Sequence, residues 1–511
     1  MKRRDFLTRS AALAGAGVLA GCASLSSDDD GDTEPTPSNR TEEPPASETP
    51  TPEPSGSLNP RHGISFETVV HAVDDLGMDP KGKNPIDDQL LSTFEQGNVL
   101  ITFPPGTYRF ETEPPAEPVT NWGVLGLGKN PRDVRFVTTP GKGRRFVNSD
   151  GGSGQLVENV AFDYSQSREG SLGLVMRAED KVHVQDVEFI GFNPVVEKGA
   201  IDNLVPMALD PGGTAVVDGL VRTGPTDIVS HGHLDNNANA GCIWLGQRHV
   251  GDLHIRNSHI SNTGTNAIYA SRTPGSVRIS DCLFENNNQT SLRIGGEGSV
   301  VENSRFVIDA ETLHPDSRGS LINPHGIIWE TGRLGKTGGR IENCEFIVKN
   351  TPERTKAAVW ADGSAGAFEV VDCRFEIDAD GVQALKIDDP RDPRLGVTAE
   401  RPWNVTIQNL VAMGSSYGKP IIEINGRPGS LIEGGCILWS QFRDAILIND
   451  SNDTTIRDLN IDVQGADITN IASTVNVQDL TSTSECTDLP IEASQRSRGG
   501  NVSVGDGDTS S

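Results

Sequence analysis

A short phrase that recurs along most of the chain constrains its fold more than any other feature. The phrase is Val or Ile, any residue, then Asn, Asp or Gly, and three residues later usually a large apolar side chain, as in Ile279 to Phe284. Successive copies begin 21 to 40 residues apart, and the third position falls at Asn159, Asp186, Asp218, Asn257, Asp281, Asn303, Asn343, Asp372, Asn409, Gly434, Asp458 and Asp479. Repeats of this length indicate a solenoid.

The spacing within the phrase indicates two short strands joined at a corner. Its two apolar positions lie five residues apart, and no single strand face allows this because strand side chains alternate. Asn, Asp and Gly tolerate the left-handed backbone of a sharp bend, so we expect a corner there with both apolar side chains pointing inward. The abundance of Val, Ile, Thr, Gly and Asn excludes helical repeats.

The N-terminus resembles an export signal followed by a tether. Arg3 and Arg4 precede a short apolar stretch, which is typical of a twin-arginine signal, and Leu19-Ala20-Gly21-Cys22 resembles the lipobox of exported lipoproteins. The resemblance implies a signal over residues 1–22, a lipid on Cys22 and a protein held on the outer face of the cell membrane or released outside the cell. Residues 23–60 are rich in acidic residues, Pro, Thr and Ser, and we expect a disordered tether.

The charge and the cysteines exclude several kinds of partner. A formal charge of −27 with an acidic, Lys-poor composition resembles the proteins of extreme halophiles and argues against nucleic acid. Six cysteines follow Cys22, and we expect them to be small buried residues rather than disulfides. No CxxC pair suggests a metal site, so we predict no cofactor, and no motif supports a Ca²⁺ site.

Residues 61–110 precede the repeats and differ from them. We expect one helix after Ser65 and a second from Asn84-Pro85 through Phe94, followed by a strand that leads into Pro104-Pro105-Gly106-Thr107-Tyr108. This order closely resembles the pectate-lyase-like superfamily, especially members with a glycosidase-28-related N-terminal region. The resemblance implies an all-β, right-handed parallel β-helix over residues 111–486, with three-strand rungs, an Asn/Asp ladder and a helical N-terminal cap. We expect residues 487–511 to be a disordered tail.

The corner also locates the third strand of each rung, and with it a candidate binding column. In segments such as Cys242 to Leu245 the flanking apolar residues point inward, so the third residue points out. The predicted outward column is Trp244, Tyr269, Arg293, Trp329, Trp360, Lys386 and Glu423. At a rung spacing of about 4.8 Å the column spans roughly 29 Å, the length of several sugars. Aromatic platforms beside cations suit an anionic glycan, although such residues are also ordinary strand formers.

Long loops flank this column on both sides. One holds His231 and His233, another holds His325, and a third is the insertion from Asp388 to Asn404. Loops on one face of a solenoid are commonly its binding face. We therefore predict substrate-binding roles for residues of the column and beside it, namely Trp244, Tyr269, Trp329, Trp360, Glu330 and His325.

Two chemistries fit the ionisable groups. Cleavage of a uronate polymer by β-elimination needs a cation to neutralise the carboxylate and a base, and Arg293 and Lys386 suit these roles. Hydrolysis needs two carboxylates at a set separation, for which Asp362 and Asp388 are candidates with Glu330 as a third. For each of these acids, however, the acid-rich composition favours a solvated loop residue or a loop cap over a catalytic role.

The sequence therefore leaves two functional hypotheses. In the first, the chain is a surface-anchored carbohydrate-active protein, a polysaccharide lyase or glycoside hydrolase that acts on acidic polysaccharide. In the second, it is a non-catalytic module that binds glycan or forms part of the cell envelope. The sequence does not predict an oligomeric state.

Overall fold

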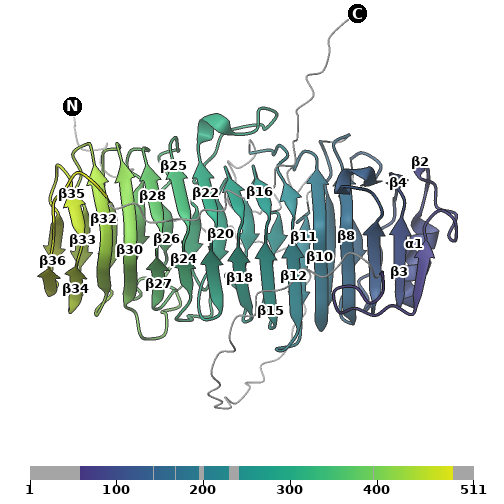
Figure 1. The fold of residues 1–511 in the computed structure, drawn as a ribbon, viewed down its shortest axis with the longest axis horizontal. Helices are drawn as coiled ribbons and strands as arrows, with labels where there is room; N and C mark the ends of the chain where they lie inside the picture. Colours follow the sequence, from purple (N-terminus) through teal and green to yellow (C-terminus); the bar gives the residue numbers. More distant parts are fainter. Residues whose placement is uncertain are drawn as a thin grey trace, which may run out of the picture.

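The chain folds into one long stack of parallel strands (Figure 1). The computed structural model describes residues 58–141, 143–166, 168–194, 201–228, 241–394 and 396–486. The predicted lipid site at Cys22, nearly all of the tether, the tail and the loop with His231 and His233 lie outside the described residues.

From β5 to β36 (residues 122–471), the rungs are built from three strand segments, as the repeat predicted. In a typical rung, β18 (Ser276–Ser280) leads to the corner at Asp281, β19 (Leu283–Glu285) follows, and a loop leads to β20 (Thr290–Ile294). Strands of the first and second kind form a 25-stranded sheet that bends at the corners, and strands of the third kind form a 12-stranded sheet. The fold is thus a right-handed parallel β-helix.

The first strands are β1 (Thr68–His71), β3 (Val99–Phe103), β5 (Trp122–Gly126), β12 (Thr214–Asp218), β15 (Asp252–Arg256), β18, β21 (Ser299–Glu302), β24 (Arg340–Glu342), β27 (Phe368–Val371), β34 (Thr454–Arg457) and β37 (Val475–Gln478). The second strands are β2 (Lys81–Pro85), β4 (Gly106–Arg109), β6 (Val134–Val137), β13 (Val221–Arg222), β16 (His259–Ser261), β19, β22 (Arg305–Ile308), β25 (Glu345–Val348), β28 (Arg374–Ile377) and β35 (Asn460–Asp462). Four strands run through the corner: β8 (Ser153–Asp163), β10 (Asp180–Ile190), β30 (Val405–Gly414) and β32 (Leu431–Trp439).

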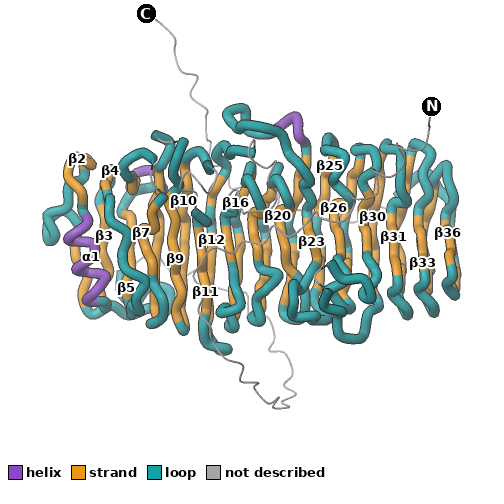
Figure 2. Tube along the Cα trace, turned by 180° about the vertical axis from the view of Figure 1, so that it is seen from behind, coloured by secondary structure: helices purple, strands orange, loops and turns teal. Residues whose placement is uncertain are grey.

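The third strands form the second sheet, and Figure 2 labels several of its members, among them β7, β20 and β36. They are β7 (Arg144–Asn148), β9 (Leu172–Ala178), β11 (Leu204–Ala208), β14 (Ile243–Trp244), β17 (Asn266–Tyr269), β20, β23 (Ile327–Trp329), β26 (Ala357–Ala361), β29 (Gln383–Ile387), β31 (Ile422–Asn425), β33 (Ile446–Asn449) and β36 (Ile468–Ile471). Among the residues that the structure describes, the helices are α1 (Asp87–Gln96) and the short 3₁₀ turns η1 (Pro131–Asp133) and η4 (Ala310–Thr312).

The corners adopt the left-handed backbone that the repeat predicted, with one shift. Asn159 has φ 53° and Asp281 has φ 55°, and the other predicted corners agree except Asp218. In that rung Val217 pairs with Val184, so Gly219, with φ 72°, takes the corner. Corner side chains also bond from rung to rung, as when the Asn343 amide donates to Asn303 at 2.6 Å.

The rung at Gly434 interrupts this ladder because glycine has no side chain to bond the preceding corner. A Cβ atom on Gly434, which has φ 70°, would lie 2.6 Å from Oδ1 of Asn409. Asn409 instead donates to Asp372 at 3.0 Å.

The N-terminal cap contains one of the two predicted helices. α1 lies at the end of the stack in Figure 1, and its Leu90 and Phe94 are buried against the core. The predicted helix after Ser65 is wrong, because residues Thr68–His71 form β1, which pairs in register with β3. Val69 and Val70 are β-branched and lie in this first rung, where a strand suits them better than a helix.

Stacked phenylalanines and small buried residues fill the interior. Phe284, Phe306, Phe346 and Phe375 stack from rung to rung with ring centroids 4.7 to 5.1 Å apart. The free cysteines are buried, as predicted, at Cys242, Cys282, Cys344 and Cys373.

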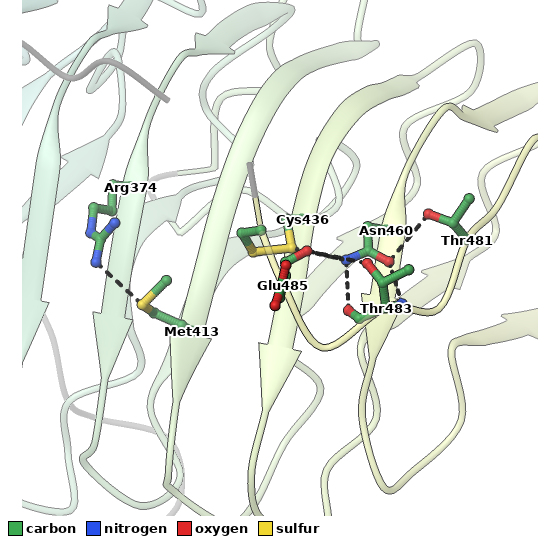
Figure 3. The surroundings of a disulfide bond; sticks show 8 residues. Arg374, Met413, Cys436, Asn460, Thr481, Thr483 and Glu485 are labelled. Carbon is green, nitrogen blue, oxygen red and sulfur yellow. Dashed lines mark hydrogen bonds between the residues drawn. A yellow bond between two sulfur atoms is a disulfide. The ribbon is translucent and has the colours of Figure 1, made fainter. Parts of the chain in front are cut away.

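The expectation of no disulfide is wrong for the last two cysteines. Cys436 on β32 and Cys486 form a disulfide across a sequence separation of 50 residues. Figure 3 shows Asn460 beside this bond, with its amide 3.3 Å from Sγ of Cys436 and 2.8 Å from the carbonyl oxygen of Thr483. Cys486 lies outside the repeat, so the corner pattern carried no information about its partner.

Within the described residues, none of the helices has the length and apolar character to cross a membrane.

Candidate functional site

The predicted column exists on the outer face of the 12-stranded sheet, with one member replaced. Strand register aligns Trp244, Tyr269, Arg293, Ile328, Trp360, Lys386 and Glu423. Trp329 was predicted to face outward, and this is wrong: it is fully buried and stacks on Phe368 with ring centroids 5.5 Å apart. Ile327, Ile328 and Trp329 are all apolar, so alternation could not distinguish inside from outside there.

Cations cover the aromatic rings of this column. The guanidinium of Arg293 lies 4.5 Å from the centre of the Tyr269 ring, and Nζ of Lys356 lies 3.7 Å from that of Trp360. Arg394 also lies over Trp360, at 5.0 Å. Tyr269 is therefore 3% exposed and Trp360 5%, while Trp244 is half-buried. The face thus presents cations rather than the bare aromatic platforms that we expected.

Three carboxylates follow the column strands on three consecutive rungs. Glu330, Asp362 and Asp388 each lie two residues after a column residue and directly follow the strand that carries it. These strands are β23, β26 and β29, which pair side by side. Side chains two residues apart share a strand face, which brings the three acids to the same edge of the sheet. The sequence predicted each acid separately but not this alignment.

Glu330 is fully buried and neutralised. Arg293 Nε donates to it at 2.7 Å, the Ser271 hydroxyl donates at 2.8 Å, and Arg394 forms a second ion pair with it. Burial acts to raise the pKa of the Glu330 carboxyl, but the two guanidinium groups and the hydroxyl outweigh burial and lower it. Arg293 and Glu330 thus bind each other rather than facing solvent.

Asp362 and Asp388 have different surroundings. Asp362 is 1% exposed and accepts from the backbone N–H groups of Ser364 at 3.0 Å and Arg394 at 3.3 Å. Asp388 is partly exposed, accepts from the indole N–H of Trp360 at 2.7 Å and pairs with Lys386. The predicted pair of hydrolytic acids therefore has one buried member and one that is already paired with a cation.

The insertion from Asp388 to Asn404 closes over these acids. Gly363 packs so tightly against it that a Cβ atom there would lie 2.5 Å from the carbonyl oxygen of Asp389. The insertion delivers Arg394 to Glu330 and Asp362. Its length was visible in the sequence, but which of its residues reaches the column was not.

Sequence reasoning missed Lys356, the most distinctive ionisable group of this face. Burial, together with the nearby charges of Lys386, Arg394 and Lys419, lowers the pKa of the Lys356 ammonium, and Asp388 opposes this effect. Lys356 immediately precedes β26, and Lys419 lies three residues before β31. The only signal for them was their position before column strands.

His325 is buried against the segment that carries Lys356. Its Nδ1 lies 2.7 Å from the carbonyl oxygen of Asn323, and its Nε2 accepts from the backbone N–H of Lys356 at 3.3 Å. Burial lowers its pKa to about 4. His325, for which we predicted substrate binding, thus contacts the backbone of Lys356.

Other groups of the described chain offer less. No three His, Cys, Asp or Glu side chains in the described residues come together as a metal site. A hollow of about 490 Å³ lies on the outer face of the bent sheet, lined by Thr107, Arg132, Arg135, Asp163 and neighbours. Its arginines already pair with Glu188 and Asp163.

Comparison with known proteins finds likeness at the level of structure only. No family model and no curated protein matches the chain. The chain matches the ORF18 protein of Geobacillus virus E2 at 13% identity and TM-score 0.36. The match covers 73% of this chain and 61% of the virus protein, which is less than two thirds of its length.

Two further solved structures give similar values. The mannuronan C-5 epimerase A-module of Azotobacter vinelandii matches at 11% identity and TM-score 0.42, covering 81% of this chain and all of that one (100%). The catalytic unit of an alpha-1,3-glucanase from Streptomyces thermodiastaticus matches at 12% identity and TM-score 0.35. That match covers 82% of this chain and 69% of the glucanase chain. These values transfer no activity to this chain.

Proposed function

We propose that this chain binds an acidic polysaccharide through the cations on the outer face of β26, β29 and β31. The observation that carries the proposal is the clustering of lysine. Lys356, Lys386 and Lys419 belong to three consecutive rungs, in a chain that has 12 lysines and a formal charge of −27. An evenly acidic surface would not place a quarter of its lysines together.

The arrangement of opposite charges supports the same proposal. The cations of this face are Arg293, Lys356, Lys386, Arg394 and Lys419, and the acids are Glu330, Asp362, Asp388 and Glu423. Two of the four acids are buried, whereas Lys356 and Lys386 are partly exposed and Lys419 is exposed. Because Asp388 and Glu423 are only partly exposed, the most exposed charge that a polyanion meets on this surface is that of Lys419.

A surface location belongs to the proposal as well. The twin-arginine pair, the lipobox Cys22 and the acidic tether would hold the β-helix outside the membrane, where it would meet extracellular polymers. Mass spectrometry of the membrane fraction tests this part: a diacylglyceryl group on Cys22 supports it, and an unmodified or absent Cys22 contradicts it.

The binding test uses charge-matched variants of the full chain. The triple variant Lys356→Gln, Lys386→Gln, Lys419→Gln removes the cluster, and Lys129→Gln, Lys181→Gln, Lys349→Gln removes three exposed lysines elsewhere. Titration calorimetry with polygalacturonate should show affinity reduced by about tenfold to a hundredfold in the first variant only, because each exposed ion pair is worth up to about 1 kcal/mol. Neutral dextran should bind neither. Equal loss in both variants would refute the site.

Cleavage by β-elimination is a second candidate, favoured by the lowered pKa of Lys356. A neutral Lys356 amine would take the proton from C5 of a uronate. The electron pair of the broken C5–H bond would form a C4–C5 double bond, the C4–O bond would break, and water would protonate the leaving oxygen. Lys386 would neutralise the carboxylate. Hydrolysis has less support because Glu330 and Asp362 are buried.

Two substitutions at one position separate binding from cleavage. Lys356→Arg keeps the positive charge but removes the base, so it should bind polygalacturonate like the wild-type chain and produce no unsaturated ends, which absorb in the ultraviolet. If the wild-type chain binds polygalacturonate and produces no such absorbance, the protein is a binding module and not a lyase. Cleavage that survives Lys356→Arg would exclude Lys356 as the base.

A further inference from the structure

Two aromatic side chains stand out on the surface beyond the lysine cluster. Tyr417 is 52% exposed and Phe442 is 64% exposed, the highest values among the large apolar residues of the described chain. Most other aromatic rings of this aromatic-poor chain are buried in the interior or beneath cations. Single exposed apolar side chains are ordinary, whereas neighbouring ones that form a patch mark binding surfaces.

The two rings lie on neighbouring loops at the same level. Gly414 at the end of β30 pairs with Trp439 at the end of β32, and Tyr417 and Phe442 each follow three residues later. The two loops lead into β31 and β33, which also pair side by side. The rings therefore belong to adjacent rungs, whose spacing is about 4.8 Å.

The loops beneath these rings are fastened by buried contacts. Arg443 is 1% exposed, donates to the Ser416 hydroxyl at 2.8 Å and also donates to the carbonyl oxygens of Lys419 and Val382. The backbone N–H of Tyr417 donates to Asp380 at 2.8 Å. A platform held in place before binding loses little conformational entropy when a ligand arrives.

The rings continue the line of the lysine cluster. Lys419 lies two residues beyond Tyr417, and its charge acts on Lys356. From β26 through β29 and β31 to β33 there are three rung steps, or about 14 Å. That distance matches a short oligosaccharide laid along the axis of the solenoid.

We infer that Tyr417 and Phe442 form a stacking subsite for a sugar ring of the same acidic polysaccharide. This inference rests on the proposed function and extends it: the polymer runs parallel to the solenoid axis, with carboxylates at the lysines and the apolar face of a more distant sugar on the aromatic pair. Pyranose rings have one such apolar face, which suits an exposed aromatic platform. The subsite therefore makes affinity depend on chain length.

Ligands of two lengths test the inference on the full chain. The double variant Tyr417→Ala, Phe442→Ala should bind an octasaccharide of galacturonate about tenfold more weakly than the wild-type chain. A disaccharide, which is too short to extend from Lys356 to Phe442, should lose much less affinity. Leu127→Ala, which removes an apolar side chain that is 44% exposed on another rung, is the matched control and should change neither affinity. Circular dichroism should show that all variants keep the fold.

The outcomes separate the two proposals. Octasaccharide affinity that is unchanged in the aromatic variant but reduced in the lysine variant overturns the subsite alone. Affinity that is unchanged in both variants, or absent in the wild-type chain, overturns the proposed function and the subsite together. Sedimentation that shows a dimer of the wild-type chain and a monomer of the aromatic variant overturns the subsite in favour of a contact between two copies.

Discussion

His325 supports the loop that carries Lys356 only while its imidazole is neutral. Its Nε2 accepts a hydrogen bond from the backbone of Lys356, and burial lowers its pKa from 6.5 to about 4. Between these two values the unfolded imidazole binds a proton and the folded one does not. Stability therefore falls as pH falls from about 6.5 to about 4, by at most about 3 kcal/mol for this group.

We expect His325→Asn to flatten this loss of stability. Guanidinium unfolding from neutral to acidic pH should show that the variant loses less unfolding free energy than the wild-type chain. Part of the loss should remain, because burial also lowers the pKa of His183 and of His254 to about 4. His71→Asn, at an exposed histidine, is the control and should keep the full pH dependence. Equal profiles for all three proteins would contradict the assignment.

Glu330 is a residue whose charge the fold depends on. Replacing it by Gln leaves the buried Arg293 and the partly buried Arg394 without their anion, and breaking a buried ion pair costs about 3 kcal/mol or more. Because the folded pKa of Glu330 is lowered, its contribution is complete above about pH 4.5 and disappears as pH falls through the lowered value. Glu330→Gln should therefore be less stable at neutral pH, whereas Glu369→Gln, at a half-exposed glutamate, should change unfolding little.

At the level of the strand, sequence predicts register wherever polar and apolar residues alternate. The corners were predictable because only Asn, Asp or Gly tolerates their backbone, and the one shift, from Asp218 to Gly219, occurred where both residues were candidates. The orientation of Trp329 was not predictable, since three apolar residues in succession carry no period of two. The cations over Trp360 come from other loops, and only the fold brings them there.

The insertion between Asp388 and Asn404 is an element whose docking can be tested with one methyl group. A Cβ atom on Gly363 would lie 2.5 Å from the carbonyl oxygen of Asp389 and 2.9 Å from Cα of Pro393. Gly363→Ala should therefore push the insertion outward, lower the unfolding free energy by about 1–3 kcal/mol and speed tryptic cleavage after Arg391 or Arg394. Gly212→Ala, where a Cβ atom meets nothing within 4 Å, should show neither effect.

Across the whole molecule, stability is distributed from neighbour to neighbour. Each rung contacts mainly the rungs above and below it, so a local change spreads over few repeats. The two ends are closed differently: α1 packs Leu90 and Phe94 onto the first rungs, whereas the last rungs are tied back by Cys436–Cys486. A solenoid of this kind should come apart first at its less well covered end, where Ile471 and Val477 are 50% and 43% exposed.

The disulfide should therefore protect the C-terminal rungs and no others. It closes a loop that contains β33 to β37, and a cross-link over a separation of 50 residues removes unfolded-state entropy worth about 4 kcal/mol. In the variant Cys436→Ser, Cys486→Ser, hydrogen exchange should become faster in residues 446–478 and stay unchanged in β3 to β8. Adding a reductant to the wild-type chain should reproduce this pattern. Faster exchange throughout the stack would mean that the rungs unfold as one cooperative unit, contrary to the nearest-neighbour account.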